Sequence, residues 1–426
     1  MKSFSSSSFA SDNAVALDLA AEAVRDNPQA LFTDFQWFLF EGKDTIFFTA
    51  FSKHRFDAQQ IQNLTAQMVA LAPQLTHGFV GARPGHPFPQ HILDAITSVE
   101  EVESFEGYPD KWLSTSRDLF NRDDLPLFRV MAANLKGGPD GHGRASIIQV
   151  RSAHCLLEGS DAALLTRSQT ANHGIQSDAS NKVAWATRAG GAFRGYMMAA
   201  IHYLVAMFRA QEDKPMHFKT LPLERQRMRE LARRLGVRQR SLFFALVTYA
   251  LHSEKDRRLN EKVITAAYTM LDTKRTASDD DFFRVRALEA KFPYSPDLAT
   301  YVRNVDKAVD DVEQKDITKF QQMVLAMFGA HRALHRIAPW MHGERFWRYS
   351  GETDVVLTLV PPHRSYGPLA DWMIEPIYCG AYHPATNLCT FCPGRDYMTL
   401  NFVMEQKHID NVGRIEGLIA QLEAAV

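Results

Sequence analysis

The 426-residue sequence has few cysteines, no charge excess of either sign and no long apolar run. Its 48 basic and 49 acidic residues give a formal net charge of −1, and no long basic run is present, which argues against nucleic acid as a partner. No apolar stretch has the uninterrupted length of a membrane span. Apolar residues make up 46% and charged residues 23%, as is typical of a soluble globular protein.

The four cysteines include one Cys-x-x-Cys pair, Cys389 and Cys392. A structural zinc site would need a second ligand pair, and only Cys379 is near in sequence. A redox pair usually opens a helix, whereas this pair lies in a strand-like run followed by Pro393. We therefore expect no metal and no cofactor, and we interpret the cysteines as small buried side chains in a protein of the reducing cytoplasm.

The length of the chain favours two domains, because single hydrophobic cores seldom grow to this size. The polar start, residues 1–20, lacks the apolar core of a signal peptide and is expected to be a disordered tip. We predict an N-terminal domain at 21–175, a crossover segment at 176–215 and a C-terminal domain at 216–426. The sequence leaves the oligomeric state open.

A predicted hairpin stands at the centre of the N-terminal domain. An apolar run at 127–135 and a β-branched run at 145–150 are separated by the Gly-rich stretch 136–143, which favours two paired strands. His154 then follows the end of the second strand, and Gly159 stands where a helix is expected to begin.

Hydrophobic periodicity predicts the other elements of the chain. Residues 78–124 carry several Gly and Pro and are expected to form an irregular surface excursion, and 170–181 a polar loop. Short apolar runs predict strands, and apolar residues at helical spacing predict helices, with 241–251 apolar on all sides and therefore buried. The predicted strands are 45–51, 354–360, 377–382 and 397–404. The predicted helices are one in the stretch 57–75, which Pro73 is expected to end, and those at 195–210, 224–235, 241–251, 316–338 and 409–422.

The most informative residues follow the hairpin, in the order Ala153-His154-Cys155-Leu156-Leu157-Glu158-Gly159. A neutral imidazole with an ordinary pKa of about 6.5 can remove a proton from an attacking hydroxyl near neutral pH. A carboxylate such as Glu158 can pair with an arginine and hold the loop that orients the ring, and Gly159 permits a sharp turn. The alternative is that His154 is a partly buried histidine with a structural hydrogen bond.

This arrangement resembles the HHxxxDG acyltransferases, which include wax ester synthases, bacterial diacylglycerol acyltransferases, condensation domains of nonribosomal peptide synthetases and chloramphenicol acetyltransferase. The second histidine of the motif, the catalytic base of that superfamily, corresponds to His154. Ala153 replaces the first histidine and Glu158 replaces the aspartate. The resemblance implies an α/β fold with mixed sheets in two domains and an active-site channel between them.

The resemblance also implies a function and its alternatives. The leading hypothesis is O-acyl transfer from an acyl-CoA thioester to an alcohol, most like that of wax ester synthases, with possible contact to a membrane or lipid droplet. The first alternative is a condensation-like enzyme that forms amides or esters from a carrier-bound acyl group. The second is a binding protein that has lost catalysis, suggested by Ala153. Neither the acyl length nor the acceptor follows from the sequence.

Two further positions bear on these alternatives. Where the buried helix of the wax synthase family usually opens with an Asn-Asp pair, this chain has Arg240 and Ser241. Several arginines also lie close together in sequence, which would suit an acidic carrier protein, although a solvated helix face is the simpler interpretation. These are Arg225, Arg227, Arg229, Arg233, Arg234, Arg238 and Arg240.

Overall fold

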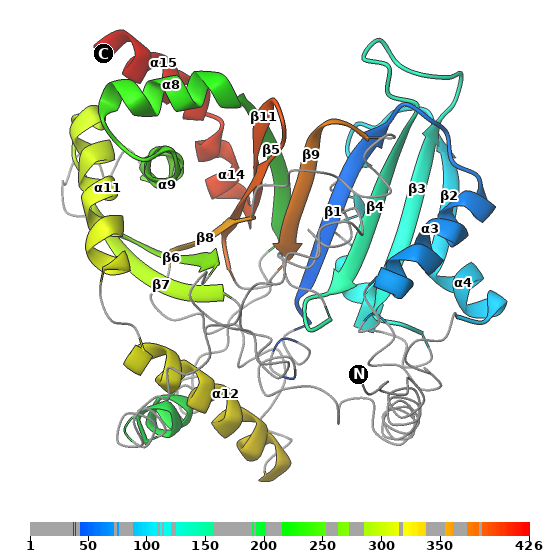
Figure 1. Ribbon diagram of the computed structural model, residues 1–426, viewed down its shortest axis with the longest axis horizontal. Helices are drawn as coiled ribbons and strands as arrows, with labels where there is room; N and C mark the ends of the chain where they lie inside the picture. Colours follow the sequence, from blue (N-terminus) through cyan, green and yellow to red (C-terminus); the bar gives the residue numbers. More distant parts are fainter. Residues whose placement is uncertain are drawn as a thin grey trace, which may run out of the picture. The chain divides into compact units, whose positions relative to one another are not determined.

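A computed structural model describes most of the regular secondary structure of the chain (Figure 1). The described residues are 37, 39, 43–71, 75, 88–108, 111–112, 115–120, 125–156, 190, 193–201, 215–252, 263–271, 285–314, 318–337, 354–360, 373–382 and 386–426. The chain divides into two compact units: Met1–Ala171 with His363–Ile374, and Asn172–Pro362 with Glu375–Val426. Within the described residues, no helix combines the length and apolar character needed to cross a bilayer.

The first sheet has five strands in the order β2-β3-β4-β1-β9. The strands are β1 (Thr45–Ser52), β2 (Thr97–Val102), β3 (Phe128–Leu135), β4 (Ser146–Ala153) and β9 (Met373–Tyr382). The central strand β4 pairs antiparallel with both β3 and β1, whereas β2 pairs parallel with β3, so the sheet is mixed. Every residue of β4 is buried, which explains why this strand has no alternation of apolar and polar residues.

The turn between β3 and β4 depends on glycine. Gly137, Gly138 and Gly143 have φ values of 81°, 102° and 75°, in the left-handed region that other residues rarely adopt. Helices α3 (Ala58–Leu71) and α4 (Gln90–Ile96) pack against β2 and β3 of this sheet. Their inward side chains include the fully buried Ile61 and Ile96.

The second sheet has six strands in the order β5-β11-β10-β8-β6-β7. These strands are β5 (Met216–Glu224), β6 (Val263–Leu271), β7 (Val285–Pro293), β8 (Val355–Leu359), β10 (Leu388–Pro393) and β11 (Tyr397–Glu405). β8 pairs parallel with β6 and β10, and the remaining pairs are antiparallel. The sheet is therefore mixed like the first.

Helix α9 (Gln239–Leu251) lies at the centre of the second core (Figure 1). All its residues from Ser241 to Leu251 are buried, as their uniformly apolar character predicted. Around it lie helices that each bury one face: α8 (Arg225–Leu235), α11 (Leu298–Glu313), α14 (Gln406–Val412) and α15 (Ile415–Ala425). The rings of Phe243, Phe244 and Phe391 meet there, with centroids 5.5–5.8 Å apart between Phe391 and its two neighbours.

The structure confirms most of the predicted elements. The hairpin, the strand at 45–51, the helices at 224–235 and 241–251, and the strands near 354–360, 377–382 and 397–404 all form. The helix predicted from residue 57 ends at Leu71, just before Pro73 as expected, and α12 (Thr318–Ile337) matches the prediction of 316–338. Gly236 ends α8 with φ 70°, the left-handed conformation typical of a glycine that follows a helix.

Two predictions were wrong. Residues 78–124 are not simply an irregular excursion, because they contain α4, β2 and the short 3₁₀ helix η2 (Ser116–Phe120). The sequence does not predict β2 (Thr97–Val102), because its residues are mostly polar and at most half-buried. The single C-terminal helix is two helices, α14 and α15, interrupted at Gly413 and Arg414.

Candidate active site

His154 is the first residue after β4, and the strand pairing fixes its main chain. Its backbone N–H donates a hydrogen bond of 2.7 Å to the carbonyl oxygen of Asp44, just before β1. Ala153 pairs with Thr45, and its N–H donates to Leu127 at 2.8 Å. The end of β4 is therefore held on both sides, which places His154 at a defined point rather than on a free loop.

The neighbours of His154 are more deeply buried than the histidine itself. Ala153, Cys155 and Leu156 have no exposed surface, whereas His154 is half-buried. The turn closes through a 3.0 Å hydrogen bond from the N–H of Leu156 to the carbonyl of Ala153. This arrangement anchors the backbone in the core and leaves His154 partly exposed.

Asp44, whose main chain binds His154, carries a buried carboxyl group that was not among the predicted site residues. Asp44 is 6% exposed, and burial raises its pKa well above the ordinary value. The thiol of Cys155 also has a strongly raised pKa, mainly because it is buried and secondarily because of the negative charge of Asp44. Cys155 is therefore protonated at neutral pH and poorly suited to act as a nucleophile.

Arg151, three residues before His154, is a second residue that sequence reasoning missed. It is 3% exposed and donates to the carbonyl oxygens of Trp112 and Thr115 and to the side chain of Gln149. Burial lowers the pKa of Arg151 to about 10. Arg151 thus fixes Trp112 and Thr115 against β4, and an arginine close to the apolar run Ile147, Ile148 and Val150 was the signal that could have identified it.

Glu158 and Gly159 lie outside the described residues. Their proposed roles, a carboxylate that pairs with an arginine and a glycine that permits a tight turn, remain predictions. The polar tip at 1–20 and the loop at 170–181 lie outside as well, and the helix predicted at 195–210 is described only to Ile201.

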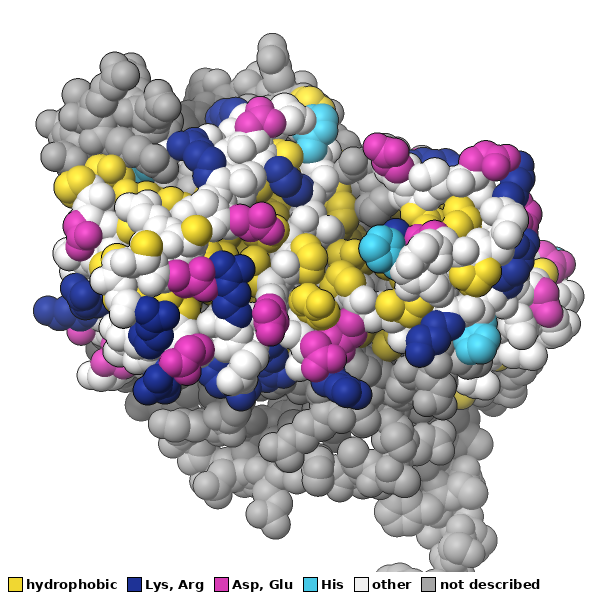
Figure 2. All heavy atoms as spheres, turned by 90° about the horizontal axis from the view of Figure 1, so that it is seen from above, with side chains coloured by type: hydrophobic (Ala, Val, Ile, Leu, Met, Phe, Trp, Pro, Cys, Tyr) yellow, Lys and Arg dark blue, Asp and Glu magenta, His cyan; other side chains and the backbone are white. Residues whose placement is uncertain are grey.

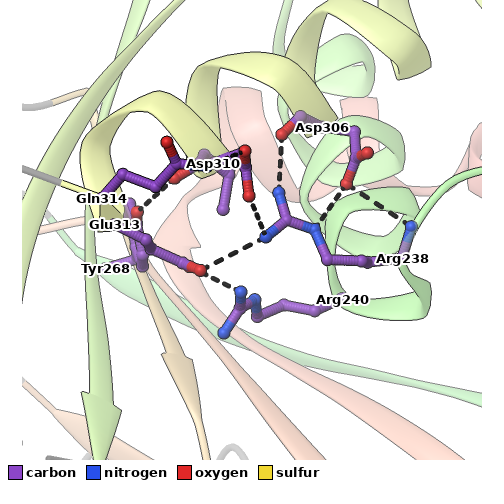
Figure 3. Close-up of polar contacts among 8 residues, drawn as sticks. Arg238, Arg240, Tyr268, Asp306, Asp310, Glu313 and Gln314 are labelled. Atoms are coloured by element: carbon purple, nitrogen blue, oxygen red, sulfur yellow. Dashed lines mark hydrogen bonds and ion pairs between the residues drawn. The ribbon is translucent and has the colours of Figure 1, made fainter.

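Arg240 and Ser241 stand where the wax synthase family has its Asn-Asp pair, and Arg240 has a structural partner (Figure 3). Arg240 forms an ion pair of 2.5 Å with Glu313, at the end of α11. Ser241 is fully buried. Burial by itself would raise the pKa of Asp306, but the Ser241 hydroxyl and the Arg238 guanidinium hold it below the ordinary value. The ion pair of Arg240 therefore joins α9 to α11.

Arg238 extends the same network. Its guanidinium contacts Asp306 at 2.8 Å, Asp310 at 3.2 Å and Glu313 at 3.3 Å (Figure 3). Other arginines of the sequence cluster are also paired, Arg227 with Glu423 at 2.7 Å and Arg233 with Glu230 at 2.6 Å. The face shown in Figure 2 has basic and acidic side chains interspersed. The cluster therefore does not form a purely basic docking patch.

The Cys-x-x-Cys pair lies on β10, where Cys389 and Cys392 are buried. Residues three apart on a strand point to opposite faces, so the two thiols cannot chelate one ion together. Within the described part of the chain, no group of three or more His, Cys, Asp or Glu side chains is arranged to hold a metal.

Comparison of the whole structure with solved structures identifies the fold. The first condensation domain of the CDA synthetase superposes with a TM-score of 0.54 at 13% identity, covering 92% of this chain and 95% of that one. The trichothecene 15-O-acetyltransferase of Fusarium sporotrichioides gives 0.53 at 12% identity, covering 94% and 93%. The chain has the condensation-domain and acyltransferase fold.

The wax ester synthase/diacylglycerol acyltransferase of Marinobacter aquaeolei VT8 shares this fold, with a TM-score of 0.50 at 14% identity over 89% of this chain and 92% of that one. No protein-family model matches the sequence, and no curated protein does so either. The predicted α/β class with two mixed sheets is confirmed.

Proposed function

We propose that this protein is an O-acyltransferase in which His154 is the general base. The observation that carries the proposal is the place of His154: a half-buried imidazole directly after β4, with its main chain bound to Asp44, in a fold shared with several acyltransferases. The donor would be an acyl-CoA thioester and the acceptor an alcohol, as in a wax ester synthase. No cofactor is needed for this reaction.

In the proposed reaction the imidazole of His154 acts first as a base and then as an acid. His154 removes the proton of the acceptor hydroxyl while the oxygen attacks the thioester carbonyl, and a tetrahedral intermediate forms. When this intermediate collapses, the C–S bond breaks, and the imidazolium returns its proton to the departing thiolate. The products are an ester and a free thiol, and His154 ends neutral, ready for another cycle. Cys155 takes no part, because its buried thiol stays protonated.

The test is a product search with purified wild-type protein. Mixtures of acyl-CoA of different lengths are incubated with panels of alcohols and amines, and untargeted mass spectrometry detects new esters or amides. The proposal expects esters with release of free CoA. Amides alone would instead assign the chain to the condensation-like alternative.

The condensation-like alternative is favoured by the likeness to the condensation domain of the CDA synthetase. It would use an acyl group bound to a carrier protein, and carriers are acidic, so a basic docking surface would be expected. Three of the arginines available for such a surface, Arg227, Arg233 and Arg238, already pair with carboxylates. This pairing supports free acyl-CoA as the donor.

The remaining alternative, a binding protein without catalysis, rests on Ala153. In the HHxxxDG superfamily the first motif histidine is usually supportive and the second does the chemistry, so the absence of the first leaves the base in place. A wild-type protein inert toward every donor and acceptor, yet able to bind one of them, would favour this alternative over transfer.

A further inference from the structure

A row of hydrogen-bonding side chains crosses the second sheet. Strand pairing places Thr390 of β10 opposite both Asn401 of β11 and Thr358 of β8. Asn401 is also opposite Thr220 of β5. Residues paired across neighbouring strands point to the same face of a sheet, so these four side chains, the polar row, lie on one face of four adjacent strands. The sequence alone does not bring them together.

The polar row lies on the face of the sheet that is turned away from helix α9. The residues on either side of Thr390, Cys389 and Phe391, belong to the core around α9, and Asn401 likewise stands between two residues of that core. Successive side chains of a strand point to opposite faces, so Thr390 and Asn401 point away from the core. The helices of that core therefore lie on the other side of the sheet from the polar row (Figure 1).

Two polar atoms in the middle of the polar row are buried without a hydrogen bond. Thr390 is 3% exposed, and Asn401 has no exposed surface. Among the described side chains, the hydroxyl oxygen of Thr390 and the amide oxygen of Asn401 make no hydrogen bond. The amide nitrogen of Asn401 donates to the main-chain carbonyls of Thr390 and Thr399, each at 3.4 Å, which directs the amide oxygen away from the strand backbone. Buried polar atoms nearly always have a partner, so two adjacent exceptions point to a partner outside the chain.

The surroundings of the polar row are uncharged. The side chains on the same face, two positions away along each strand, are Phe218, Pro222, Val356, Val360, Leu388, Cys392, Thr399 and Val403. A carboxylate or ammonium group placed here would be buried without a counter-charge, which is costly. The ligand group is therefore neutral. It must donate to the amide oxygen of Asn401 and can accept from the hydroxyl of Thr390, and a hydroxyl group does both with one oxygen atom.

We propose that Thr390 and Asn401 form a binding site for a hydroxyl group of a small-molecule ligand. The ligand hydroxyl donates to Asn401 and accepts from Thr390, so both buried atoms gain a partner. Leu388 and Val403, which pair with each other beside the polar row, suit the hydrocarbon part of such a ligand. Binding does not depend on acyl transfer. Only the consequence that the site selects a substrate with a hydroxyl group beyond its reacting group rests on the proposed function.

The test measures binding rather than transfer, so it stays decisive if no ester is formed. Decanol is compared with a series of decanediols, and decanoyl-CoA with a series of hydroxydecanoyl-CoA thioesters, in which the added hydroxyl group moves along the chain. Each compound is offered alone to the full wild-type chain, and calorimetry measures its dissociation constant. Wild type is expected to bind one hydroxylated compound about tenfold more tightly than the plain one. The two series show whether an alcohol or an acyl thioester brings the hydroxyl.

Thr390→Val is the decisive variant, because it removes the hydroxyl group and keeps the branched side chain. It is expected to abolish the preference for the hydroxylated compound and to melt no lower than wild type, since a buried hydroxyl without a partner does not stabilise the fold. Thr390→Ser retains the hydroxyl and should keep the preference. The matched control is Thr49→Val, which removes a buried hydroxyl that accepts a 3.0 Å hydrogen bond from Gln149. This control should melt lower than wild type and keep the preference.

Three results would overturn the proposal. The first is wild-type protein that binds the plain and hydroxylated compounds equally or binds none of them. The second is a Thr390→Val protein that keeps the preference. The third is a Thr390→Val protein that melts lower, as Thr49→Val does, while wild type shows no preference. That result would assign the two buried atoms to a bound water only.

Discussion

At the scale of single residues, the carboxyl group of Asp44 gives a test of the local environment of His154. Its folded-state pKa is raised by burial above the unfolded value near 3.9, so the folded protein binds a proton more tightly than the unfolded chain does. As pH rises above the unfolded-state pKa, the carboxyl group ionises in the unfolded chain, whereas in the folded protein it stays protonated or ionises inside the core, and either outcome costs folding free energy. Its contribution therefore favours folding at low pH and is lost as pH rises toward the folded-state pKa.

Asp44→Asn removes this titration while keeping the size of the side chain. We expect the variant to gain stability relative to wild type as pH rises from about 4 toward the folded-state pKa of Asp44, by up to about 1.4 kcal/mol per pH unit within that window. Urea unfolding of both proteins at several pH values measures the difference. A difference that stays constant with pH would show that Asp44 has an ordinary pKa.

Ala153 gives a second prediction at this scale. Its side chain is fully buried between the paired strands, so an imidazole there would have to displace packed neighbours. Ala153→His, which would restore the family's two-histidine motif, is expected to destabilise the protein by about 1–3 kcal/mol and to leave turnover no higher than that of wild type. The melting temperature and the initial rate measure both. A gain in turnover would favour the binding-protein alternative.

At the scale of elements, the pairing of α9 with α11 depends on a charge network. Glu313 faces both Arg238 and Arg240, at 3.3 and 2.5 Å. Glu313→Gln removes the counter-charge of two guanidinium groups that are at most about one-third exposed, and we expect a loss of about 1–3 kcal/mol in unfolding free energy.

Glu230→Gln is the matched control, because Glu230 pairs with Arg233 on the exposed face of α8. Exposed ion pairs contribute little, so no measurable change in unfolding is expected. Urea denaturation measures the unfolding free energy of both variants. Equal losses would show that the α9–α11 network contributes no more stability than an exposed ion pair.

The accuracy of prediction from sequence also differed between elements. β4 could be predicted from its β-branched residues next to a Gly-rich turn, and α9 from a run of apolar residues long enough for a buried helix. Polar edge strands such as β2 could not, because their pairing depends on a neighbour remote in sequence, here β3. β5 to β7 and α11 were not predicted at all; β5 contains Pro222 and is mostly half-buried.

The candidate site shows the same division. His154 could be predicted because it follows a strand and stands in a motif-like order. Asp44 could not, because its proximity arises only from the pairing of Thr45 with Ala153 across about a hundred residues of chain. Arg238 and Arg240 were ambiguous in sequence, since the carboxylates that pair with them belong to another helix.

At the scale of the whole molecule, the distribution of charge bears on the acyl donor. Basic and acidic side chains are interspersed on the face shown in Figure 2, and four of the seven clustered arginines, Arg227, Arg233, Arg238 and Arg240, pair with carboxylates. We therefore expect one acyl chain to be transferred faster from CoA than from a purified acyl carrier protein. A direct competition between the two donors measures this, and a much faster reaction of the carrier form would reassign the donor.

The central claim is that His154 supplies the base for acyl transfer. The most direct measurement compares the initial rate of ester formation by wild type and by His154→Ala, with circular dichroism and thermal unfolding to verify the fold. We predict a rate lower by a factor of about 10²–10⁴ in a protein of unchanged fold. A correctly folded His154→Ala protein that retains near-wild-type turnover would contradict the account.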